Sequence, residues 1–106
     1  MPIIYHIASE HDWDDARAAG NYTAASFAAE GFIHCSLEHQ VDGVLARYYA
    51  GKTGLVKLHI DTDKLTSRLE FERAASVGED FPHIYGPINI DAVIQVVPIS
   101  PGKYSE

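Results

Sequence analysis

One stretch near the middle of the chain has the spacing of an amphipathic helix, and segments with strand-like alternation follow it. Over residues 38–50, apolar side chains recur at i, i+3, i+4, i+7 and i+8, on one helical face: Val41, Val44, Leu45, Tyr48 and Tyr49. Residues 55–61 and 68–73 instead alternate between apolar and polar, with Leu69 and Phe71 turned inward in the second segment. A helix with one apolar face must bury that face, so we expect it to pack on the sheet.

The remaining segments complete a fold of the α+β class. Ser9 fits a helix N-cap, with Asp12 three residues later, and Gly20 fits the end of the same helix. We predict strands over residues 2–8, 31–36 and 92–99, a short helix over 13–19, and irregular segments over 22–30 and 75–82. Because the strands cluster late in the chain, this order predicts a small mixed or split β-sheet with two flanking helices.

Composition restricts the class of protein and of partner. With 106 residues and 46% apolar content, the chain fits a single domain over residues 1–106. A formal charge of −7 argues against binding along duplex nucleic acid but permits one small anionic ligand. Residues 1–10 lack the basic and apolar stretches typical of a secretory signal, no apolar run reaches the ~20 residues that a membrane span needs, and the one cysteine is typical of a reducing compartment. We therefore expect a cytoplasmic protein with no membrane partner, either a monomer or a weak homodimer.

Three of the six histidines interrupt apolar stretches. These are His6, His34 and His83, and a partly buried imidazole needs a hydrogen-bond partner. We predict that the three side chains line one small-molecule cleft, although each could instead be a core histidine whose hydrogen bonds are satisfied. The other three histidines are predicted to be surface residues: His11, His39 and His59.

Alternation along the GFIHCS segment sorts its side chains onto two faces. Phe32, His34 and Ser36 share one face, whereas Ile33 and Cys35 point the other way, so we expect Cys35 to be an inert core thiol. A nucleophilic pair of Cys35 with His34 is disfavoured, because neighbours on a strand diverge. A hydrolase pair of Ser36 with His34 is also weak, since residues i and i+2 lie about 7 Å apart at Cα.

Zinc is the alternative ligand for the histidines. The neutral imidazoles of His6, His34 and His83 would be good metal ligands if folding brought them together. The H-C-x3-H spacing of His34, Cys35 and His39 is only superficially ligand-rich, and no C-x2-C or H-E-x-x-H motif supports it. We expect no bound metal, and a metal-holding module remains the alternative.

Several strings of the sequence resemble a family of small bacterial proteins, the domain of unknown function numbered 952. The strings are Tyr5-His6-Ile7-Ala8, Trp13, Glu30-Gly31-Phe32-Ile33-His34-Cys35-Ser36, Gln40-Val41 and Phe81-Pro82-His83-Ile84-Tyr85-Gly86-Pro87-Ile88. The resemblance runs from Ile4 to about Pro98, nearly the whole chain, and the EGFIHCS and FPHIYGPI strings in this order are specific.

That family is in turn similar to the ADP-ribosyltransferase superfamily, which includes RNA 2′-phosphotransferases. The resemblance implies an ADP-ribosyltransferase-like fold that binds NAD, or a related ADP-ribose-containing molecule, as its substrate. It implies catalytic roles for His6, His34 and His83, with His6 holding the nicotinamide ribose. The ligand-binding residues that it implies are Tyr5, Phe32, Ser36 and Tyr85.

This sequence departs from the superfamily pattern at one position, because the usual glutamate has no clear counterpart. Glu70 and Glu72 are predicted to face outward on their strand, so the resemblance implies that His83 or Tyr85 substitutes. One function consistent with these residues is ADP-ribosyl or glycosyl transfer through an oxocarbenium-like state. The alternatives are a non-enzymatic ligand- or metal-binding module that uses the same histidines, and a structural subunit whose histidines lie in the core.

Overall fold

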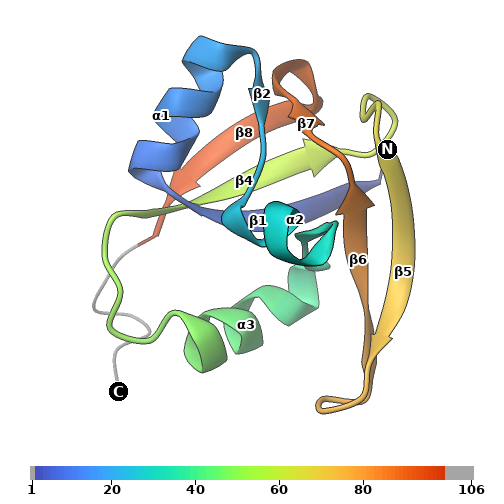
Figure 1. Cartoon of the computed structure of the whole chain (residues 1–106). Coiled ribbons are helices and arrows are strands. Elements are labelled where there is room, and N and C mark those ends of the chain that lie inside the picture. The colour runs from blue at the N-terminus through green and yellow to red at the C-terminus, as the bar shows by residue number, and fades with distance from the viewer. Residues whose placement is uncertain (1, 100–106) are drawn as a thin grey trace.

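The computed structural model describes residues 2–99, which form a mixed α+β fold with eight short strands in the described chain (Figure 1). The strands are β1 (Ile3–Ser9), β2 (Asn21–Tyr22), β3 (Ile33–His34), β4 (Leu55–Asp61), β5 (Arg68–Ala74), β6 (Glu79–Tyr85), β7 (Ile88–Asn89) and β8 (Val93–Pro98). One sheet has the order β1-β4-β8, a second has the order β3-β6-β5, and β2 pairs with β7. The sheet is therefore split, as predicted, and the described strand pairs are antiparallel.

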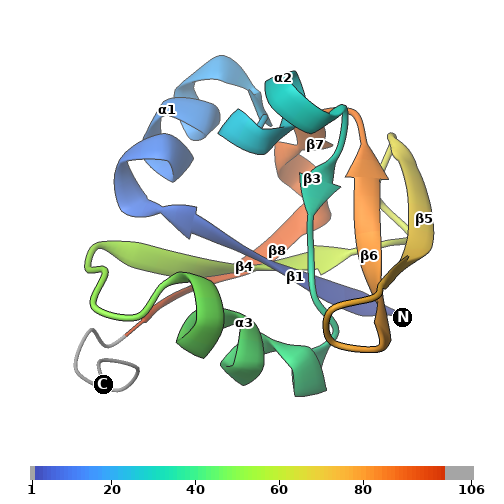
Figure 2. The ribbon, with the colours of Figure 1, turned by 60° about the horizontal axis from the view of Figure 1, so that its bottom comes forward.

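Helices cover both faces of the first sheet. The helices are α1 (Glu10–Ala19), α2 (Ala25–Glu30) and α3 (Val41–Tyr48), with 3-10 turns at Glu38–Gln40 and Ile90–Ala92. Figure 1 shows α1 and α3 on opposite sides of β1 and β4, with β5 and β6 standing across one end. In Figure 2, β3 runs beside β6 and leads from α2 down to α3.

The first helix follows the predicted local signals. The Ser9 hydroxyl accepts a hydrogen bond from the Asp12 backbone amide at 3.0 Å, which satisfies one of the free amides of the first turn. Gly20 ends the helix with a φ of 96°, a left-handed conformation that favours glycine. The helix begins at Glu10, three residues before the predicted start, because the cap fixes its first turn.

The apolar stripe of α3 packs on the first sheet, as its spacing predicts. Val41 and Leu45 are buried against Ile7 and Leu55, which come from β1 and β4. Tyr48 departs from the prediction, because its side chain is 60% exposed at the C-terminal end of the helix.

Two segments predicted to be irregular contain regular structure. Residues 22–30 hold Tyr22 of β2 and all of α2, a six-residue helix that is too short to show a clean apolar period. Residues 75–82 hold a short turn and then the first half of β6, which begins at Glu79. The β5–β6 pairing that fixes this strand is a tertiary contact, so the local sequence does not reveal it.

Two strands differ in extent or orientation from the prediction. The predicted strand over 31–36 is reduced to β3, although Ser36 still forms a bridge to Tyr5 of β1. On β5 the predicted inward residues separate: Leu69 packs on the core, but Phe71, two residues further along the same face, is 51% exposed.

The main core lies between the two sheets and α1. The alternating β4 residues Val56, Leu58 and Ile60 are buried there, as predicted, together with Ile33 and Ile84 of the second sheet. Among residues 2–99, no helix has the length and apolar character needed to span a membrane.

Candidate functional site

A cleft of about 830 Å³ lies along the edge of β1, where β3 and the β5–β6 hairpin approach it. Its wall includes His6, His34 and His83, so the structure brings all three predicted histidines to one concavity. The predicted ligand-binding residues Tyr5 and Ser36 also line it. The cleft is large enough for a small organic ligand, since typical ligand pockets measure roughly 300–1,000 Å³.

His34 and His83 form a close pair in this wall. The two residues are direct partners in the β3–β6 register, and their ring centroids lie 5.2 Å apart. The Phe32 ring stacks on His83 at 4.1 Å and meets the edge of His34 at 4.8 Å. The side chain of His83 is 13% exposed, whereas that of His34 is 53% exposed. The pair therefore joins a sheltered imidazole to an accessible one.

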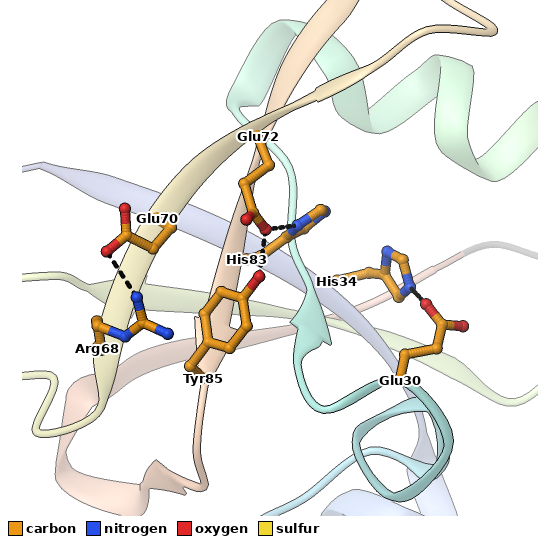
Figure 3. Close-up of polar contacts among 7 residues, drawn as sticks. All are labelled: Glu30, His34, Arg68, Glu70, Glu72, His83 and Tyr85. Carbon is orange, nitrogen blue, oxygen red and sulfur yellow. Dashed lines mark hydrogen bonds and ion pairs between the residues drawn. The ribbon is translucent and has the colours of Figure 1, made fainter.

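Each of these histidines has a glutamate partner (Figure 3). Nε2 of His34 lies 2.8 Å from Oε1 of Glu30, at the end of α2. Nδ1 of His83 lies 2.6 Å from Oε1 of Glu72 on β5, and the same oxygen accepts a 2.6 Å hydrogen bond from the Tyr85 hydroxyl. The hydrogen bonds from Tyr85 and His83 lower the pKa of Glu72, and the bond to Glu72 raises the pKa of Tyr85. Glu72 is therefore an ionised acceptor for both.

Phe32 and Tyr85 flank the histidine pair rather than line the cleft. The Tyr85 ring lies 5.5 Å from the Phe32 ring, and the Arg68 guanidinium lies over Tyr85 at 4.3 Å. A cation over an aromatic face at this distance is attracted by the ring quadrupole. Four of the predicted site residues thus form one cluster of rings centred on Phe32, the others being His34, His83 and Tyr85.

His6 has a different environment from the other two histidines. Its side chain belongs to the buried core at 6% exposure, and both of its ring nitrogens are hydrogen-bonded. Nδ1 donates to the backbone carbonyl of His34 at 2.6 Å, because a carbonyl oxygen can only accept. Nε2 then accepts from the Tyr22 hydroxyl at 2.9 Å. Burial lowers the pKa of His6 to about 4, so the ring is neutral at physiological pH.

The edge of β1 presents backbone hydrogen-bonding groups to the cleft. The amide and carbonyl of Tyr5 bond to Ser36, so the backbone groups of Tyr5 point away from β4. In an antiparallel strand every second residue points the same way, which turns the amide and carbonyl of Ile7 toward the cleft. Within residues 2–99 no backbone partner lies opposite Ile7.

The remaining predictions for Cys35 and the surface histidines have mixed outcomes. Cys35 is buried in the core and burial raises its thiol pKa, as predicted. His11 and His39 are exposed, as predicted, and each lies 3.4 Å from a carboxylate. His59 lies on the face of β4 opposite the core, as predicted, but it is partly buried rather than exposed. Its ring packs edge-on against Tyr5 at 4.8 Å, burial lowers its pKa, and its Nε2 is buried without a partner among the described residues.

Three residues of the site were not predicted from the sequence, namely Glu30, Glu72 and Tyr22. Glu72 was expected to face outward, but its face of β5 is the one that meets the rings of His83 and Tyr85. The alternation of β5 was correct and Leu69 does face the core, but the opposite face, which carries Glu72, is also partly covered. Because this covering depends on the elements that pack against the strand, the strand's own sequence does not determine it.

The described residues do not assemble the zinc site considered as an alternative. Among residues 2–99, no three His, Cys, Asp or Glu side chains converge on a point where they could hold a metal ion. Both nitrogens of His6 are already engaged, so it would have to break a buried hydrogen bond to become a ligand.

Comparison with known proteins places the chain in a family. Residues 7–96 match the model of the family described as "Protein of unknown function (DUF952)". The chain belongs to the DUF952 family. This confirms the family resemblance carried by the EGFIHCS and FPHIYGPI strings.

Solved structures of one relative have the same fold as this DUF952 chain. The crystal structure of CC0527 from Caulobacter crescentus is 32% identical, with a TM-score of 0.84, over 92% of this chain and 86% of that one. The solution structure of CC0527 is 33% identical, with a TM-score of 0.80, over 94% of this chain and 86% of that one. No curated protein matches the sequence.

Proposed function

We propose that this DUF952 protein binds NAD, or a related ADP-ribose-containing molecule, in the cleft along β1, and that it transfers the ADP-ribosyl group there. The observation that carries the proposal is the pairing of His34 and His83, each with a glutamate, in the wall of one large cleft. Paired imidazoles can hydrogen-bond a ribose and move protons at neutral pH. This arrangement gives a nucleotide-type ligand a polar end within a cleft whose walls are largely aromatic and apolar.

The composition of the cleft wall suits the rest of such a ligand. Tyr5, Tyr49 and Phe81 supply aromatic surface for the rings of a dinucleotide. Lys52 and Arg73 supply positive charge for its diphosphate, although Arg73 also pairs with Asp80 at 3.1 Å. These local cations make a small anionic ligand compatible with a chain whose net charge is −7.

The backbone of Ile7 suits the nicotinamide group. A carboxamide carries one acceptor oxygen and an amino donor, and Ile7 offers an amide donor and a carbonyl acceptor on the same edge of β1. Two hydrogen bonds of this kind would orient the nicotinamide ring, with its ribose directed toward the histidine pair. In this arrangement His6 positions β1 and β3 around the ligand through its two buried hydrogen bonds.

The proposal includes a relationship between this protein and the ADP-ribosyltransferase superfamily. It also places the protein in the cytoplasm. Two small antiparallel sheets that meet along a cleft support the relationship, together with the motif order that carries the resemblance. A binding module without turnover would use the same cleft and would differ only in leaving NAD intact.

Calorimetric titration tests the proposal with three ligands in parallel: NAD, ADP-ribose and zinc chloride. We expect NAD and ADP-ribose to bind at one site, and His34→Ala to weaken NAD binding by about 0.5–1.5 kcal/mol, the value of one hydrogen bond. His11→Ala is the matched control, because its exposed ring pairs with Asp15 outside the cleft. Absence of NAD and ADP-ribose binding to the wild type would refute the proposal, and selective zinc binding would favour the metal-binding alternative.

A further inference from the structure

The hydrogen bonds of His83 fix which of its nitrogens can act as a base. Glu72 is a carboxylate whose pKa is lowered, so its oxygen is the acceptor of this hydrogen bond. Nδ1 of His83 is then the donor and carries the hydrogen. A neutral imidazole with hydrogen on Nδ1 carries its lone pair on Nε2. No hydrogen bond from Nε2 of His83 to another group is seen within residues 2–99. In its neutral form the ring thus has an acceptor nitrogen that the described residues leave unengaged, and His83 lines the cleft.

The shelter around His83 limits what can approach that nitrogen. Phe32 stacks on one face of the ring at 4.1 Å and His34 stands edge-on beside it, leaving the side chain 13% exposed. An acceptor side chain on another protein could reach the ring only across an open surface. A water molecule can reach it through a much smaller gap. The geometry favours a small hydroxyl over a macromolecular acceptor.

We propose that the acceptor in this cleft is water and that His83 is its general base, which makes the protein an NAD glycohydrolase. The inference rests on the proposed function. The bond between C1′ of the ribose and the nicotinamide nitrogen breaks, and its electron pair stays on that nitrogen and neutralises the pyridinium charge. The water oxygen forms a new bond to C1′, and one water proton passes to Nε2 of His83 and then to solvent. The products are nicotinamide, ADP-ribose and one proton.

Glu72 is a positioning residue in this reaction. It holds the proton on Nδ1, keeps the ring oriented, and stabilises the imidazolium that forms when Nε2 takes the proton. Tyr85 donates to the same carboxylate oxygen and so fixes the carboxylate in turn. An acid–base group backed by an oriented carboxylate is an arrangement that enzymes use to activate hydroxyl nucleophiles.

Nicotinamide release from NAD tests the inference, with NAD affinity measured separately on each variant by calorimetry. We expect His83→Ala to lower kcat by about 100-fold or more while NAD still binds, since general base catalysis contributes about 10²–10⁴-fold. Glu72→Gln keeps the size of the side chain but removes its charge. It is expected to lower kcat by roughly 10-fold with KM unchanged. His39→Ala is the matched control, because His39 also pairs with a glutamate, Glu79, but lies outside the cleft wall.

The possible outcomes separate this inference from the proposed function. NAD binding to the wild type without nicotinamide release overturns the glycohydrolase and leaves the binding site standing. Full turnover in both His83→Ala and Glu72→Gln also overturns it, because the base would then be elsewhere. Loss of turnover in the Glu72→Gln protein with unchanged NAD affinity and unfolding midpoint supports it, even if His83→Ala fails to fold. A wild type that does not bind NAD refutes both proposals.

Discussion

The ring of His6 donates a 2.6 Å hydrogen bond from Nδ1 to the backbone carbonyl of His34. This bond joins β1 of the first sheet to β3 of the second, and the Tyr22 hydroxyl attaches β2 to the same ring. A single neutral imidazole in the cleft wall therefore connects three strands. The position of the His34 side chain depends on this contact, because the bonded carbonyl belongs to the same residue.

Replacing His6 by Ala is expected to destabilise the fold by about 2–4 kcal/mol. The change leaves a buried tyrosine hydroxyl and a backbone carbonyl without their partner, and each unsatisfied buried group costs about 1–3 kcal/mol. Urea unfolding measures the loss, with the exposed His11→Ala variant expected within about 0.5 kcal/mol of wild type. A loss below 1 kcal/mol for His6→Ala would show that water replaces the ring.

The lowered pKa of His6 also predicts how the free energy of unfolding changes with pH. Burial lowers its pKa from 6.5 to about 4 in the folded state, so between these values the unfolded chain binds more protons. The contribution of the neutral His6 ring to the free energy of unfolding is complete above about pH 6.5 and is lost as the pH falls toward 4. The free energy of unfolding decreases by roughly 3 kcal/mol over this range. Unfolding free energies of wild type and His6→Gln at pH 7.5, 5.5 and 4.5 measure this decrease. The amide does not titrate, so the variant is expected to lose less stability than wild type, and equal losses would contradict the assignment.

Leu45→Ala is expected to destabilise the protein by about 2–5 kcal/mol. Leu45 is almost completely buried between α3 and the first sheet, where its removal leaves a cavity against Ile7 and Leu55. Tyr48→Ala on the same helix is the comparison, because the Tyr48 side chain is 60% exposed. If both variants lose similar stability in denaturant unfolding, the stripe is not what holds the helix to the sheet.

The sequence was sufficient to predict the features that local chemistry determines. The Ser9 cap, the alternation of β4 and the burial of Cys35 are properties of short segments, and the structure confirms each of them. The approach of His34 to His83 was also predicted, because both residues interrupt apolar stretches that had to be covered.

Features that depend on partners distant in sequence were missed. Glu72 contacts His83 only because β5 pairs with β6, and the alternation of β5 is compatible with either face being covered. That His6 could be a core histidine with satisfied hydrogen bonds was foreseen, but its partners were missed for a related reason. Its two hydrogen bonds go to Tyr22 and to the backbone of His34, and no local pattern indicates a partner 16 or 28 residues away.

Chemical-shift mapping during an NAD titration is the most direct test of where a ligand binds. We expect the backbone amide of Ile7 and the imidazole resonances of His34 and His83 to shift together and to saturate, because these residues line one cleft. The rings of His11 and His39, which lie outside the cleft wall, are expected to stay unchanged. Shifts confined to His11 and His39, or a spectrum that NAD does not alter at all, would show that NAD does not bind in this cleft.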